Sequence, residues 1–63
     1  MDKSLEIVMS QIDQRRNDLV TAVAVNTVKD WAEYQRICGE IRGLSTAEGY
    51  ILDLVKNMER DDD

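Results

Sequence analysis

The sequence predicts an all-α fold, a two-helix antiparallel hairpin. Apolar residues recur every three or four positions in two long segments, and one short stretch rich in β-branched residues separates these segments. A chain of 63 residues forms one small domain at most. Hydrophobic residues make up 43% and charged residues 33%, a balance unlike that of a disordered tail or a membrane protein. We therefore expect residues 1–63 to form a single helical domain.

The first predicted helix covers about residues 4–24. Ser4 is a suitable N-cap, and Glu6 falls in the first turn, where a carboxylate complements the helix dipole. Arg16 is the one interruption of the apolar stripe on this helix. The stripe itself comprises Leu5, Val8, Ile12, Leu19 and Val23, and Met9 and Val20 widen it.

The turn is predicted at about residues 25–29. The β-branched residues here lower helix propensity, and Asn26 and Thr27 compete with the backbone for hydrogen bonds. Either of these two side chains would cap the next helix. A short strand is a rival reading of the alternating valines, although such a strand would have no partner in a chain of this length.

The second predicted helix covers about residues 30–58. Glu48 stands at the one position where its apolar pattern lacks an apolar residue. Residues 59–63 should fray, because acids at a helix C-terminus oppose the dipole. The apolar residues follow a seven-residue rhythm of the kind that packs helices at shallow angles, and they are Tyr34, Ile37, Ile41, Leu44, Ile51, Val55 and Met58.

Small residues form a ridge on the second helix. Gly39, Gly43 and Ala47 lie four residues apart. Each glycine inside a helix costs about 1 kcal/mol relative to alanine, so a packing reason is expected. The ridge packs either against the first helix or against a neighbouring chain. A third alternative is a break near Gly43–Thr46, which would create a third short helix capped by a serine or threonine.

The composition excludes most chemistry. The chain has no histidine and no phosphate-binding loop, and its paired carboxylates have no pocket to shield them. We therefore expect no enzyme activity, no catalytic residue, no cofactor, no metal site and no small-molecule substrate. The lone Cys38 has no partner for an internal disulfide, and its place in the apolar pattern suggests a small core residue.

The charge balance also limits the partners. Eight basic and 13 acidic residues give a net charge of −5, which argues against direct binding of nucleic acid. The acidic N-terminal segment lacks a long apolar run, so neither a signal peptide nor a membrane span is expected, and the predicted location is cytoplasmic.

The strongest functional prediction concerns apolar surface that one chain leaves uncovered. With a turn at residues 25–28, Arg16 would lie near Ile37. The N-terminal end of the first helix would then lie beside Ser45 or Glu48 of the second helix. The last apolar residues of the second helix would then need a protein partner or another copy of the chain. The aromatic pair near its start either closes the hairpin over Val23 and Val25 or contacts that partner. The predicted interface residues are Trp31, Tyr34, Gly39, Gly43, Ile51, Val55 and Met58.

A rival function uses the acidic residues. A small acidic inhibitor would occupy a basic site on a nucleic-acid-binding protein, and its affinity would fall steeply with salt. The carriers would be Asp13, Asp18, Glu33, Glu40, Asp53 and residues 61–63.

Residues 34–44 carry a resemblance. Their sequence is YQRICGEIRGL, in which an aromatic residue is followed by a small or apolar pair ending in glycine, an aliphatic residue, a second glycine and a leucine. With the amphipathic helix and acidic end that follow, this segment resembles very short acidic proteins encoded among the head and tail morphogenesis genes of tailed bacteriophages. The resemblance implies a minor virion or assembly component that contacts capsid, portal or tail proteins and has no chemistry of its own. It would be cytoplasmic when made and part of the virion later.

Overall fold

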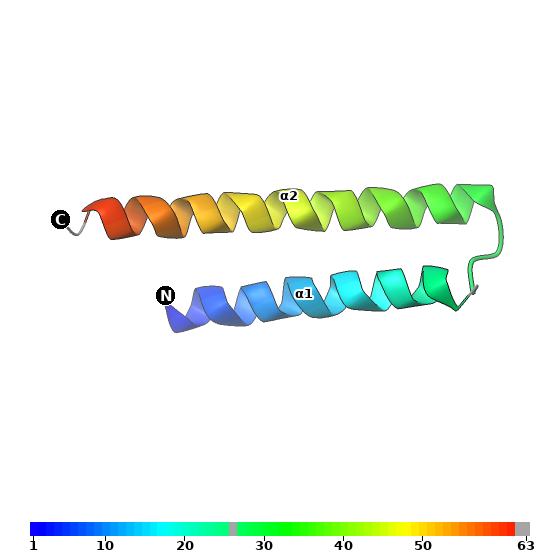
Figure 1. Cartoon of the computed structure of the whole chain (residues 1–63), viewed down its shortest axis with the longest axis horizontal. Coiled ribbons are helices and arrows are strands. Elements are labelled where there is room, and N and C mark those ends of the chain that lie inside the picture. The colour runs from blue at the N-terminus through cyan, green and yellow to red at the C-terminus, as the bar shows by residue number, and fades with distance from the viewer. Residues whose placement is uncertain (26, 62–63) are drawn as a thin grey trace.

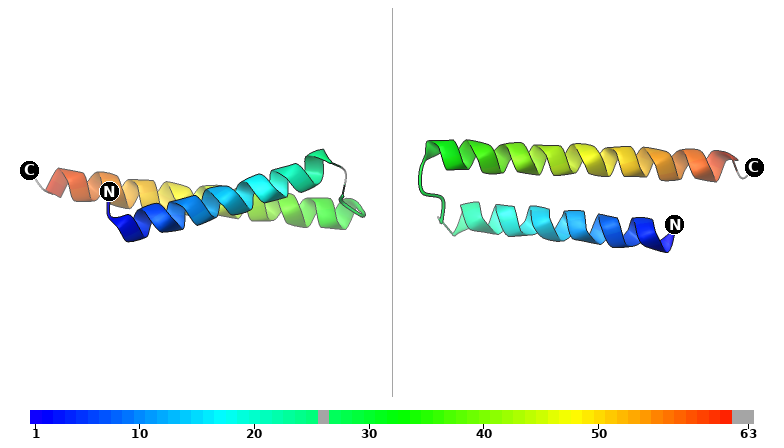
Figure 2. Two further views of the ribbon diagram at one scale, coloured as in Figure 1. Left: turned by 90° about the horizontal axis from the view of Figure 1, so that it is seen from below. Right: turned by 180° about the vertical axis from the view of Figure 1, so that it is seen from behind.

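The chain folds into two antiparallel helices joined by a short connection (Figure 1). The computed structural model describes residues 1–25 and 27–61. α1 spans Lys3–Ala24 and α2 spans Trp31–Asp61. The two helices cross at a shallow angle and form a rod of 51 × 17 × 13 Å (Figure 2). The predicted all-α hairpin is confirmed.

The two ends of α1 are closed by side chains. Asp2 is the N-cap, because its Oδ1 accepts a hydrogen bond of 2.7 Å from the Ser4 backbone N–H. The predicted cap at Ser4 is therefore wrong, since Ser4 already lies in the first turn. At the other end, the Thr27 N–H and hydroxyl donate to the Ala22 carbonyl at 3.1 and 2.9 Å. Thr27 thus ends α1 and does not begin α2, and the predicted cap at Asn26 lies outside the described residues.

α2 begins with a pair of reciprocal hydrogen bonds. Asp30 Oδ1 accepts from the Glu33 N–H at 2.8 Å, and Glu33 Oε2 accepts from the Lys29 N–H at 2.8 Å. This arrangement is close to a capping box, in which a cap and the residue three positions later satisfy each other's backbone donors. The start of α2 is therefore set by Asp30 and Glu33, and not by the residues predicted to cap it.

α2 is one continuous helix. It passes through Gly43–Thr46 without a break, and the Thr46 hydroxyl donates to the Arg42 carbonyl at 2.9 Å, as a helical threonine does. The three-helix alternative is therefore wrong. α2 runs to Asp61, three residues beyond its predicted end at about residue 58, and the fraying of the acidic end stays a prediction. Arg60 lies in the last turn, where a cation complements the dipole. Residues 62–63 lie outside the described part of the chain.

The core between the helices is a narrow seam. Among the described residues only Leu19 and Ile37 are buried, with 5% and 3% of their surfaces exposed. Most other residues of the two predicted stripes are half-buried, and the exceptions are exposed: Val8, Tyr34 and Met58. Two helices share only one line of contact, so this fold hides few of its apolar side chains completely.

The register of the hairpin differs from the prediction. Arg16 lies against Ser45 and Glu48, and not near Ile37. α1 ends at Ala24 and α2 begins at Trp31, so the bounds of the predicted turn at about residues 25–29 are off by no more than about one residue. The ion pairs of Arg15 with Glu40 and of Arg16 with Glu48 place the facing residues of α2 closer to its C-terminus than predicted. α1 consequently reaches further along α2 than predicted, although α2 still extends beyond it at the open end (Figure 1).

Candidate interaction surface

The hairpin exposes more surface than a protein of its mass normally does. Its accessible area is 4914 Å². A monomeric protein of 7.2 kDa would expose about 4100 Å² by the scaling that folded proteins follow. The large apolar side chains that contribute to this surface are Met1, Ile7, Val8, Val20, Val25, Trp31, Tyr34, Tyr50, Leu52, Leu54 and Met58.

The aromatic pair predicted at the start of α2 forms a stack. The rings of Trp31 and Tyr34 lie 5.3 Å apart at an interplanar angle of 24°. They border a hollow with Val23 and Val28, but Trp31 and Val25 remain 67% and 60% exposed. The stack therefore does not close the end of the hairpin over Val25.

Cys38 follows Tyr34 by one helical turn and is half-buried. Hydrogen bonding with its thiol, followed by charge interaction, raises the pKa of Tyr34 above that of a free phenol. Cys38 also borders an open hollow with Arg42, so it lies at the edge of the core and not within it.

The two glycines of the small-residue ridge face open space. A Cβ built on Gly39 or Gly43 would meet no atom within 4 Å. The interpretation that the ridge packs against the first helix is therefore wrong. Among the described residues no atom explains why glycine stands at these two positions, and packing of the ridge against a neighbouring chain stays a prediction.

The predicted uncovered stripe at the end of α2 is only partly uncovered. Ile51 and Val55 are half-buried, and Val55 and Met58 border a hollow with Leu5 of α1. The expectation that α1 ends before it reaches these residues is therefore wrong. Met58 itself is 47% exposed. The assignment of all seven predicted residues to an interface stays a prediction.

Two exposed residues of α2 were missed by the sequence argument. Tyr50 is 71% exposed and Leu54 is 50% exposed. A signal for them existed, because they continue the small-residue ridge: Ala47, Tyr50 and Leu54 follow one another at spacings of three and four. The ridge was read as ending at Ala47, where its side chains change from small to large.

The two polar interruptions of the apolar stripes meet each other. The Arg16 guanidinium donates to both carboxylate oxygens of Glu48 at 3.1 Å, and it also bonds Ser45 at 3.2 Å and Asp13 at 2.6 Å. Only 25% of the Arg16 side chain and 21% of that of Glu48 are exposed. The hydrogen bond from Arg16 lowers the pKa of Glu48. A bidentate pair in the seam fixes which residues of the two helices face each other.

A second ion pair joins the helices nearer the connection. Arg15 donates to Glu40 through two nitrogens, one of them at 3.0 Å, and Arg36 lies 3.7 Å from the same carboxylate. The hydrogen bond from Arg15 lowers the pKa of Glu40. Glu33 is also paired, with Arg36 at 3.9 Å. Several of the acidic residues that the inhibitor hypothesis requires are thus engaged by arginines of the same chain.

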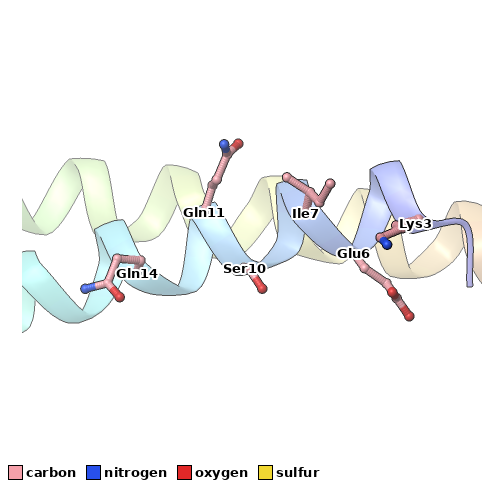
Figure 3. A pocket seen from close by; sticks show the side chains of 6 residues that line it. All are labelled: Lys3, Glu6, Ile7, Ser10, Gln11 and Gln14. Carbon is pink, nitrogen blue, oxygen red and sulfur yellow. The ribbon is translucent and has the colours of Figure 1, made fainter.

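The hollows of the molecule are open surface features. The one in Figure 3 is lined from α1 alone, and its side chains point in different directions along and around that helix. Within residues 1–25 and 27–61 no three histidine, cysteine, aspartate or glutamate residues gather as metal ligands would. Neither described helix combines the length and the apolar character that a bilayer-crossing segment requires.

Comparison with known proteins adds no relative. No family model matches the chain, and no curated protein or solved structure is significantly similar to it.

Proposed function

We propose that this hairpin is a non-enzymatic interaction module that docks on protein through the outer surface of α2. The observation that carries the proposal is the set of apolar side chains that α2 turns to solvent, among them Tyr50 at 71% and Leu54 at 50% exposure. Apolar residues grouped along one helix are typical of helix-in-groove and helix-on-helix recognition. Trp31 and Tyr34 offer a second anchor at the other end of the same helix.

The charges favour apolar docking over electrostatic inhibition. Asp13, Glu33 and Glu40 each lie within ion-pair distance of an arginine in this chain. An acidic inhibitor would have to present these carboxylates to a foreign basic site, so their internal pairing weakens that function. Association through α2 should accordingly change little with ionic strength.

The resemblance of residues 34–44 supplies a proposed setting. In a tailed bacteriophage the surface of α2 would contact capsid, portal or tail proteins, and the module would be one of several copies on the particle. The length of the rod suits a spacer or a clamp between larger subunits.

Site-specific photocrosslinking tests the proposal. A benzophenone amino acid replaces Tyr50 on α2, and a control variant carries it at Gln11, an exposed residue of α1 (Figure 3). In cells that make the protein, we expect discrete crosslinked protein bands from position 50 and few from position 11. Equal labelling from both positions, or no crosslinked protein from position 50, would contradict docking through α2.

A further inference from the structure

The outer seam of α2 has two halves of opposite character. We define it as Gly39, Gly43, Ala47, Tyr50, Leu54 and Met58, which follow at spacings of four and three and so lie on one stripe about 100° wide. The first three residues are small, and the two glycines leave open space beside the helix. The last three are large, and between 47% and 71% of their surface is exposed. None of the six is charged.

We infer that the occupant of this seam is a second copy of the same chain, with its α2 running antiparallel. This inference rests on the proposed docking function and names the partner. Pairing Ala47 with Tyr50 of the other copy also pairs Gly43 with Leu54 and Gly39 with Met58. Every small residue then receives a large one, and the arrangement repeats itself about a two-fold axis, as an isologous interface must.

The area of the hairpin fits this occupant. The chain exposes 4914 Å², about 800 Å² more than a monomer of its mass would. A stable interface of standard size takes about 800 Å² from each partner. One copy therefore carries roughly the surface that a two-fold dimer hides.

The antiparallel direction follows from the shape of the seam. In a parallel pair, Tyr50 would face Tyr50 of the other copy and Leu54 would face Leu54. The glycines would then face glycines across a gap. Close-packed interfaces avoid both crowding and voids, because each loses dispersion contacts. The antiparallel pair avoids both the crowding and the void, since it packs the large residues of one copy against the small residues of the other.

Sedimentation equilibrium of the full chain provides the first test. We expect the wild-type chain to sediment as a dimer of twice 7.2 kDa at micromolar concentration. Leu54→Glu should weaken the dimer by at least about a hundredfold, because each dimer loses two buried leucines. The matched control is Leu52→Glu, since Leu52 is 47% exposed against 50% for Leu54 but points about 200° away around the helix. Leu52→Glu should leave the dimer intact, and equal loss in both variants would overturn the seam.

Disulfide trapping tests the register. In a Cys38→Ser background, Gly43→Cys and Leu54→Cys chains are mixed under oxidising conditions. We expect the mixed disulfide between positions 43 and 54. The antiparallel pair holds two copies of residue 43 about 16 Å apart along the helix, beyond the reach of a disulfide, which needs Cα atoms within about 7 Å. Disulfides between like chains, or none in the mixture, would overturn the antiparallel pairing.

The two proposals fail in different ways. A wild-type chain that sediments as a monomer at every concentration overturns the second copy as occupant. If position 50 still crosslinks to other proteins in that case, docking through α2 stands with a foreign partner. If crosslinking at position 50 fails as well, the docking function itself is refuted.

Discussion

Replacing Gly43 by alanine should stabilise the monomer more than the assembled state. Glycine is about 1 kcal/mol less favourable than alanine inside a helix. A Cβ at this position would meet no atom within 4 Å, so nothing in the hairpin opposes the gain. The isolated hairpin should therefore be stabilised by about 1 kcal/mol, which raises the melting temperature of a chain this short by about 4–8 °C.

Gly49→Ala is the matched control for this change. Its Cβ also meets no atom within 4 Å, but Gly49 lies outside the outer seam. We expect both variants to melt higher than the wild type, by similar amounts, in dilute solution. At high concentration Gly49→Ala should keep its gain. Gly43→Ala should lose part of it, because the new methyl group occupies space meant for Leu54 of the second copy.

Circular dichroism melting at several protein concentrations measures both effects. Destabilisation by Gly43→Ala in dilute solution would show that the ridge packs within the chain and would refute the structural reasoning. Identical gains for the two variants at every concentration would refute the pairing of the outer seam. A gap between the variants that widens with concentration is the expected result.

Three further predictions concern the hairpin itself. Arg16→Met and Glu48→Leu should each lower the urea midpoint of unfolding. The double variant should have a higher midpoint than either single variant, because it replaces a half-buried ion pair with an apolar contact in the seam. A double variant with a lower midpoint than either single variant would contradict this. The pKa values of Glu40 and Glu48 are lowered in the folded state, so their contribution is present above the carboxyl pKa of the unfolded chain and lost as pH falls below about 4. Thermal melts from pH 7 to pH 3 should show this loss, and Glu48→Gln should reduce it; an unchanged pH profile in that variant would refute the assignment. Asp30→Ala should lower the free energy of unfolding by about 1 kcal/mol, because it removes the N-cap of α2. The control Asp53→Ala should leave this free energy nearly unchanged in the same urea unfolding experiment. Equal losses in the two variants would argue against the cap.

The sequence was sufficient to predict the elements and their order. The apolar spacing of Leu19 and Ile37 places both on the seam, and among the described residues these two are the ones that the structure buries. The helix ends were harder, because several acids and hydroxyls compete for each cap. Asp2 and Asp30 were chosen over Ser4 and Thr27 by backbone geometry that composition does not reveal.

The predicted register of the two helices was wrong. The turn at about residues 25–29 agrees with the observed helix ends, but Arg16 contacts Ser45 and Glu48 and not the predicted Ile37. The two interruptions of the apolar pattern, Arg16 and Glu48, would have corrected the register if they had been paired, because opposite charges on two buried stripes stabilise one another only when they face each other. The sequence prediction ended the small-residue ridge at Ala47. It did not join Tyr50 and Leu54 to the ridge, because it treated small and large residues as separate features.

The central claim is that a single copy of this hairpin is incomplete and that a second copy covers the outer seam of α2. The concentration dependence of thermal unfolding, followed by circular dichroism together with sedimentation of the same samples, tests it most directly. We predict a melting temperature that rises with protein concentration as dimers form, since association stabilises only the folded chain. A strictly monomeric chain with one sharp transition at a temperature independent of concentration would contradict the claim.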